Sequence, residues 1–141
     1  MRPVTRIALV SALFTFRVIA AAQPAPRPTP PAPPSGVKRA LLQRIDVPVS
    51  PQHECVFGSA ELAPGASIGR HFHDGYEIGY VLEGEAEVTV DGEPAKHMKA
   101  GESYRIDPRK PHDVRNVGTG PAKAIATWIV EKGKPLATPV K

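Results

Sequence analysis

The stretch GASIGRHFHDGYEIGYVLEG, residues 65–84, places two histidines and a glutamate within seven positions. His71 and His73 are two residues apart, so on an extended strand their side chains leave the same face and converge. Glu77 follows the turn-forming pair Asp74-Gly75, and a bend there would bring its carboxylate beside the two imidazoles. The spacing predicts part of a metal site, although a His-x-His pair near an acid also arises by chance.

The chain beyond Gly36 consists of short runs rich in Val, Ile, Tyr and Thr, separated by turn signals about every eight to twelve residues. Asp91-Gly92 is the clearest of these signals and predicts a tight type I′ hairpin turn. Such spacing is typical of an all-β antiparallel sandwich or barrel. Residues 37–45 are the best candidate for a helix, but they fit an extended arm equally well.

The strand expected around Glu77 is apolar on both faces. One face carries Ile78, Tyr80 and Leu82, and the opposite face carries Glu77 followed by small or apolar residues. A strand of this kind should be covered on both sides. The outer cover would be either the arm at residues 37–45 or a second subunit, so we expect a homodimer.

The first 36 residues differ in composition from the rest of the chain. Residues 1–22 have a basic start, an apolar run and an Ala20-x-Ala22 cleavage pattern, which predict a signal peptide. The run is shorter than the roughly 20 residues of a spanning helix, so we expect no stable membrane span after cleavage. Residues 23–36 form a proline-rich linker, and residues 37–141 are expected to form one domain. The protein is therefore expected to be periplasmic or secreted.

The net charge of +4 does not indicate a nucleic-acid partner. Three of the 18 basic residues lie within the first 22 positions, and the remaining 15 nearly balance the 14 acidic residues. Cys55 is the only cysteine, so no internal disulfide is expected, and its apolar neighbours predict a buried, inert thiol.

A second segment, GESYRIDPRKPHDVRN at residues 101–116, supplies a third imidazole. His112 follows a proline-bracketed turn and begins another strand, which in a small sandwich can lie beside the strand of His71 and His73. Three imidazoles and one carboxylate would bind one divalent transition metal and leave one or two coordination positions for water or a substrate. This ligand set suits Mn, Fe, Ni, Cu, Co or Zn and does not select among them.

In these two segments the sequence resembles the cupin family. The first cupin motif, G(x)5HxH(x)3-4E(x)6G, is matched at every position by Gly65, His71, His73, Glu77 and Gly84. The second motif, G(x)5PxG(x)2H(x)3N, is matched at Gly101, His112 and Asn116. Asp107 and Arg109 stand where this motif has proline and its second glycine, so we expect the turn to survive with altered geometry.

The resemblance implies a double-stranded β-helix, or jelly-roll barrel, of six to eight strands over roughly residues 62–130. It also implies a metal in the barrel mouth, held by His71, His73, Glu77 and His112. The resemblance does not fix a reaction, because cupins include enzymes, ligand binders, storage proteins and sensor domains. Asn116 is expected to form structural hydrogen bonds at a strand end.

Three functional hypotheses follow. The first is a small-molecule dioxygenase of quercetinase-like type, in which Glu77 also serves as the catalytic base. The second is a noncatalytic module that binds a small molecule or the metal itself. The third is an assembly element in which a metal only staples the barrel.

Other polar and aromatic residues are expected to lie apart from the site. His53 and His97 fall outside both motifs and are expected to be solvent-exposed. Tyr104, Arg105 and Trp128 would line a pocket in some strand registers, but a core or surface position is expected for each.

Overall fold

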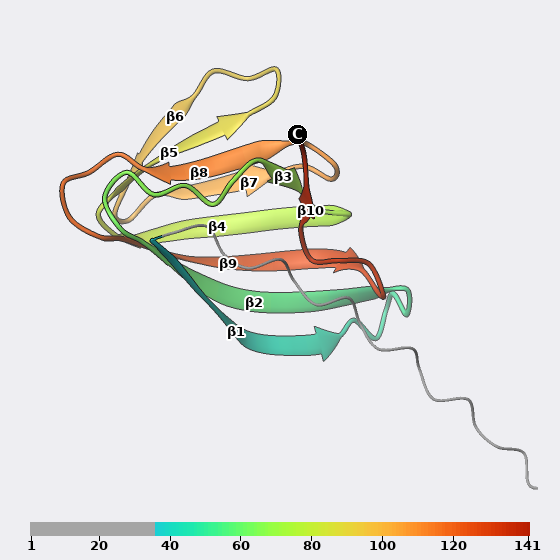
Figure 1. The fold of residues 1–141 in the computed structure, drawn as a ribbon. Coiled ribbons are helices and arrows are strands. Elements are labelled where there is room, and N and C mark those ends of the chain that lie inside the picture. Colours follow the sequence, from blue (N-terminus) through green and yellow to red (C-terminus); the bar gives the residue numbers. More distant parts are fainter. Residues whose placement is uncertain (1–35) are drawn as a thin grey trace, which may run out of the picture.

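The computed structural model describes residues 36–141, which form ten β-strands and no helix (Figure 1). The predicted all-β jelly-roll barrel is confirmed. The predicted signal peptide and the proline-rich linker up to residue 35 lie outside the described residues. Within residues 36–141 there is no helix that could cross a membrane.

Two five-stranded sheets build the barrel, and all their strand pairs are antiparallel. The β4 sheet has the order β1-β2-β9-β4-β7 and contains β1 (Val37–Asp46), β2 (His53–Leu62), β9 (Ala122–Glu131), β4 (Gly75–Glu83) and β7 (Ser103–Ile106). The β8 sheet has the order β10-β3-β8-β5-β6 and contains β10 (Thr138–Pro139), β3 (His71–Phe72), β8 (His112–Asn116), β5 (Glu85–Val90) and β6 (Lys96–Lys99). The strands outnumber the six to eight expected because β1 and the two-residue β10 extend the sheets.

Alternating apolar residues close one part of the barrel. The core cluster consists of Val81, Ala86, Val88, Val90, Met98, Ile106 and Val114. Full burial of such a side chain stabilises the fold by about 1.5–3 kcal/mol. This core offsets the cost of burying the polar groups that β3, β4 and β8 bring together in the barrel.

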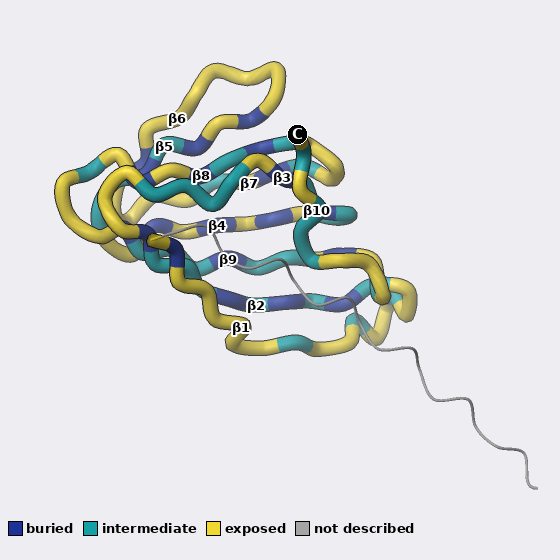
Figure 2. The backbone as a smooth tube through the Cα atoms, in the orientation of Figure 1, coloured by how far each residue is buried: buried dark blue, intermediate teal, exposed yellow. Residues whose placement is uncertain are grey.

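The arm at residues 37–45 is extended and does not cover the outer face of β4. It belongs to β1, which pairs only with β2 at the sheet edge and is mostly exposed along its length (Figure 2). Within residues 36–141 nothing therefore covers the outer face of β4 and β9, where Tyr76, Ile78, Tyr80, Leu82 and Ile129 are 41–54% exposed. Of the two covers expected for this face, the arm at residues 37–45 is therefore wrong.

The hairpin predicted at Asp91-Gly92 forms, but not with a two-residue type I′ turn. Gly92 has a φ of 80°, whereas Asp91 has no positive φ, and the β5–β6 pairing ends at Val88 and Lys96. Pro94 lies in the resulting longer loop and has no N–H with which to extend the ladder. Cys55 is likewise less buried than predicted, because it lies on the outer face of the β4 sheet opposite Ile129.

The turn before β8 is kept although Arg109 stands where the second motif has glycine. Arg109 adopts a φ of 59°, a left-handed conformation that glycine adopts readily. Its backbone N–H donates to His73 O at 2.8 Å, its Nη1 donates to Asp74 Oδ1 at 2.7 Å, and its guanidinium lies 5.2 Å from the Phe72 ring centroid. These contacts offset the backbone strain beside the strand that carries the histidines.

Replacing Arg109 separates the strain from the contacts. Arg109→Ala keeps the unfavourable φ and loses the side-chain contacts, whereas Arg109→Gly loses the same contacts and relieves the strain. We expect Arg109→Gly to be more stable than Arg109→Ala by about 1 kcal/mol, measured by urea unfolding. Equal stability of the two variants would show that the left-handed turn carries no strain.

Candidate metal centre

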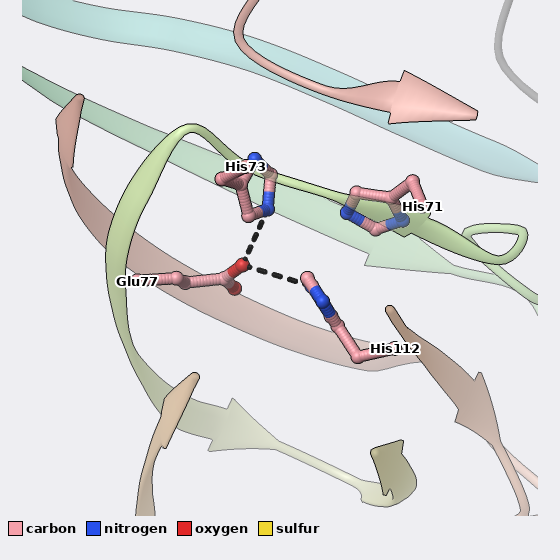
Figure 3. A group of neighbouring side chains, drawn as sticks. All are labelled: His71, His73, Glu77 and His112. Carbon is pink, nitrogen blue, oxygen red and sulfur yellow. Dashed lines mark hydrogen bonds and ion pairs between the residues drawn. The ribbon is translucent and has the colours of Figure 1, made fainter. Parts of the chain in front are cut away.

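Four buried side chains meet inside the barrel mouth (Figure 3). His71 lies on β3 directly opposite His112 of β8, His73 follows at the end of β3, and Glu77 projects inward from β4. Each residue is at most 9% exposed, and one potential ligand atom from each lies within 4.8 Å of the others. The structure thus brings together all four residues that the sequence singled out.

Two of the imidazoles are oriented by local backbone carbonyls. His71 Nδ1 lies 2.6 Å from Gly69 O, and His112 Nδ1 lies 2.9 Å from Lys110 O. Because a carbonyl oxygen can only accept, Nδ1 of each ring carries the proton, and the lone pair of the neutral ring is on Nε2. This is the arrangement in which metal-binding histidines are commonly held.

The third imidazole follows the same rule with a distant partner. His73 Nδ1 donates to Leu136 O, and Trp128 Nε1 donates to His73 Nε2 at 3.2 Å. The Nε2 atom of His73 therefore presents a lone pair, and the Trp128 ring lies 5.8 Å from the His73 ring, centroid to centroid. All three imidazoles are held in the tautomer that a metal requires.

Glu77 supplies the negative charge of the cluster. Its Oε2 lies 2.7 Å from His73 Nε2 and 3.2 Å from His112 Nε2. Its Oε1 accepts a hydrogen bond from the Tyr104 hydroxyl at 3.0 Å. The carboxylate is thereby fixed with one oxygen toward the imidazoles and the other toward the phenol.

Tyr104 reaches Glu77 because β4 has a glycine at the facing position. Gly79 pairs with Tyr104 across β4 and β7, and a Cβ at Gly79 would lie only 2.1 Å from the tyrosine ring. No other residue type leaves room for the phenol there. The hydrogen bond to Glu77 thus depends on a glycine two residues along the same strand.

The pKa values follow from burial and from the central carboxylate. Burial alone would raise the pKa of Glu77, but the hydrogen bonds with His112 and His73 together outweigh it and hold that pKa well below its usual range. Burial lowers the pKa of His71 to about 4. Burial also lowers the pKa of His112, but its hydrogen bond and charge interaction with Glu77 reverse the shift and raise it. Burial, with the Glu77 charge, raises the pKa of Tyr104, which stays a donor.

The donor set fits a divalent transition metal. A carboxylate oxygen and an imidazole lone pair 2.7 Å apart repel each other unless a proton or a metal cation interacts with both. Three imidazole nitrogens and one carboxylate oxygen are ligands that such metals accept. The chemistry and the burial of the four groups therefore favour a cation at their centre.

The side chain of Asp113 holds the loop before β3 in place. Asp113 Oδ1 accepts from Gly69 N at 2.9 Å, and its Oδ2 accepts from the Ser67 hydroxyl at 2.6 Å. Gly69 is the residue whose carbonyl orients His71. Asp113, which follows His112 in sequence, therefore links the two histidine-bearing strands through the loop.

Asn116 has the structural role predicted for it. Its side-chain amide donates to Leu62 O at 2.9 Å and to Gly120 O at 2.8 Å, and its Oδ1 accepts from Gly118 N at 2.8 Å. These bonds join β2, β8 and the loop before β9. Asn116 is confirmed as a structural hydrogen-bonding residue.

Two residues expected to lie apart from the site, Tyr104 and Trp128, contact it. Tyr104 is the cross-strand partner of Gly79, and Trp128 that of Glu77, so strand register was the missing information. Arg105 is exposed and paired with Asp107. His53 and His97 lie outside the cluster, His97 exposed and His53 half-buried.

A shallow hollow of about 370 Å³ lies at the end of the outer face of the β4 sheet. Its lining residues are Ser50, His53, Asp74, Gly75, Tyr76, Pro108, Arg109, Ile129 and Glu131. None of the four cluster residues lines this hollow. The chemistry of the buried cluster, rather than the size of a hollow, identifies the candidate site.

Comparison with known proteins identifies the family and agrees with the barrel fold. The family model described as "Cupin domain" matches residues 58–130. The chain is 41% identical over 64 residues to the HTH-type transcriptional regulator PuuR of Escherichia coli K12, covering 45% of this chain and 34% of the regulator. It is 33% identical over 76 residues to the oxalate-binding protein of Thermotoga maritima, covering 53% and 62% of the two chains.

Among solved structures, an oxalate oxidase in complex with the substrate analogue glycolate is similar, with a TM-score of 0.61 and 24% identity. The similarity covers 76% of this chain and 56% of the oxidase, and at this identity it supports the fold alone. The chain thus spans about a third of the regulator and less than two thirds of the other two proteins.

Removing the Tyr104 hydroxyl tests its hold on Glu77. Tyr104→Phe keeps the ring over Gly79 but leaves Glu77 Oε1 without its donor. We expect about a tenfold loss of zinc affinity, measured by competition with a chelator, because groups that orient metal ligands commonly contribute this much. The matched control is Tyr80→Phe on the exposed outer face, which should bind zinc like the unmodified chain. Equal affinities in both variants would contradict an orienting role for Tyr104.

Proposed function

Because this chain belongs to the family of cupin domains, we propose that it binds one divalent transition metal and presents it to a small molecule. The ligands are His71, His73, Glu77 and His112. The observations that carry the proposal are that Nδ1–H of all three imidazoles donates to a backbone carbonyl, and that Nε2 of His73 and Nε2 of His112 lie 2.7 and 3.2 Å from one oxygen of the buried Glu77 carboxylate.

When bound, such a metal acts as a Lewis acid that polarises an oxygen atom of its ligand. The side chains around the site are arranged to hold such a metal. With a metal bound, the imidazoles would be neutral lone-pair donors and Glu77 would offset part of the metal charge, while Tyr104 keeps the carboxylate from rotating. Burial of all four ligands excludes bulk water and strengthens their electrostatic interactions.

We propose a small carboxylate as the class of ligand. The oxalate-binding protein and the glycolate-bound oxalate oxidase among the similar proteins support this class by their names. In this chain, Trp128 Nε1 lies 3.2 Å from His73 Nε2 and offers an N–H donor at the edge of the cluster. Arg39 of β1 donates from Nη2 to Ile68 O at 2.9 Å, which places a cationic group beside the loop that precedes β3.

The contacts of Glu77 favour a site that binds a ligand without catalysing a reaction, as in a noncatalytic binding module. Both oxygens of Glu77 are engaged, so a role as catalytic base would require it to leave Tyr104 or the imidazoles. The quercetinase-like dioxygenase is the second candidate, supported by the complete ligand set of His71, His73, Glu77 and His112. A metal that serves only as a staple is the third.

Trp128 makes the metal proposal directly measurable, because it is the only tryptophan of the chain and lies beside His73. Cobalt added to metal-free protein should quench its fluorescence until one equivalent is bound. The double variant His71→Ala/His112→Ala should show no saturable quenching, and His97→Ala, outside the cluster, should behave like the unmodified chain. Saturable quenching of the double variant would contradict the assigned ligands.

The same loaded protein separates the three uses of the site. Oxalate, glycolate and a flavonol are added while binding, oxygen uptake and product formation are followed. Oxalate binding without turnover is the expected result. Turnover that the double variant loses would support the dioxygenase, and metal that raises the melting temperature while no compound binds would support the staple.

We also propose that a second copy of the chain covers the exposed outer face of the β4 sheet. Five strands at about 4.8 Å spacing and a nine-residue β4 at about 3.3 Å per residue give a face of roughly 700 Å². A stable interface buries about 800 Å² on each partner. The whole outer face of the sheet therefore comes close to the area of a stable interface, and the exposed apolar residues of β4 and β9, Ile78 among them, would form its apolar part.

Light scattering coupled to size-exclusion chromatography tests the dimer. The unmodified chain should elute with the mass of two chains, and Ile78→Glu should elute as a monomer, because a carboxylate would be buried without a partner. Thr89→Glu, at an exposed position on β5, is the control and should remain dimeric. A monomeric unmodified chain, or a dimeric Ile78→Glu, would contradict the proposed interface.

We further propose that residues 1–22 direct export to the periplasm or the outside of the cell and are then removed. The basic start and the Ala20-x-Ala22 pattern support this. The mature chain would begin at Gln23, as its intact mass would show.

A further inference from the structure

We propose that the C-terminal segment, residues 135–141, is required for tight metal binding, because its Leu136 carbonyl fixes the orientation of His73. This inference rests on the proposed metal-binding function. It assigns a role to a part of the chain that lies beyond the region matched by the cupin family model, which ends at residue 130.

The anchor of His73 differs from those of the other two histidines. The carbonyls that orient His71 and His112 each lie two residues earlier in the chain, so the local strand supplies them. The carbonyl that orients His73 lies 63 residues away, on Leu136. The tautomer of His73 therefore depends on whether the C-terminal segment is in place.

The C-terminal segment is attached to the strand that carries the ligands. In β10, Thr138 pairs with Phe72 and Pro139 pairs with His71. Figure 1 shows β10 beside β3, close to the C-terminus. The only strand that β10 pairs with in residues 36–141 is β3, so this short pairing links the segment to the metal centre.

The last two residues extend this attachment. Val140 N donates to Arg70 O at 3.0 Å, and Arg70 Nη1 donates to Lys141 O at 3.1 Å. Arg70 is held in turn by an ion pair with Asp91 at the end of β5. Arg70 is thus exposed and holds the C-terminal segment instead of contacting the metal site.

Loss of the Leu136 carbonyl would remove the reason for His73 to keep its proton on Nδ1. With the proton on Nε2, the ring would donate to Glu77 Oε2, which lies 2.7 Å away, and would present no lone pair to a metal. Anchored Nδ1 favours metal binding, and a free Nδ1 favours the competing bond to Glu77.

A chain shortened to end at Lys134 tests the inference. Zinc affinity, measured by chelator competition, should fall about tenfold or more relative to the full chain. Nitrogen-15 NMR of the zinc-loaded proteins should show the Nδ1–H signal of His73 lost or rapidly exchanging, while those of His71 and His112 persist. The synthetic peptide of residues 135–141, added in excess, should restore part of the affinity.

A second variant covers the case in which the shortened chain does not fold. Val140→Pro removes the N–H that donates to Arg70 O, whereas its matched control, Val140→Ala, keeps that N–H. We expect Val140→Pro to lose zinc affinity and to broaden the His73 signal selectively, and Val140→Ala to match the full chain.

Unchanged zinc affinity together with an unchanged His73 signal, in the shortened chain or in Val140→Pro, would overturn the inference. Failure of the full chain itself to bind zinc would instead contradict the proposed function. In that case the Nδ1–H signal of His73 in metal-free protein, compared between Val140→Pro and Val140→Ala, still decides whether the C-terminal segment orients the ring.

Discussion

The hydrogen bonds from imidazole Nδ1 atoms to backbone carbonyls are the constraint on which the centre of this protein depends. Each bond fixes a proton on the outer nitrogen of a ring and leaves a lone pair on the inner one. Three such rings around the Glu77 carboxylate make a buried group that is stable only with a proton or a metal cation among its members. Backbone carbonyls of the folded chain accept these bonds, so correct folding itself orients the metal ligands.

Further residues support the metal ligands at positions where the backbone takes an unusual conformation or comes close to a neighbouring side chain. Gly79 makes room for Tyr104, whose hydroxyl holds one oxygen of Glu77. Arg109 accepts a left-handed conformation so that its N–H can reach the carbonyl of His73. A strained residue and a small residue therefore lie close to the ligands, while the apolar cluster contributed by β4, β5, β6, β7 and β8 stabilises the barrel.

The sequence was sufficient to predict the all-β barrel and the meeting of His71, His73, Glu77 and His112, because period-two spacing and two cupin motifs are local signals. Tyr104 and Trp128 could not be placed, because their contacts depend on the register between strands distant in sequence. Leu136 contributes only a backbone oxygen, which no pattern of side chains records. The uncovered outer face around Ile78 also required the sheet order, since β1 lies at the edge and not over β4.

The most direct test of a buried cation site is the metal content of the mature protein, purified from its own compartment without an affinity tag and measured by mass spectrometry. The variant His71→Ala/His112→Ala, prepared in the same way, is the comparison. We expect close to one divalent transition metal per chain, lost in the variant. Equal and negligible metal in both proteins would contradict a metal site at these residues.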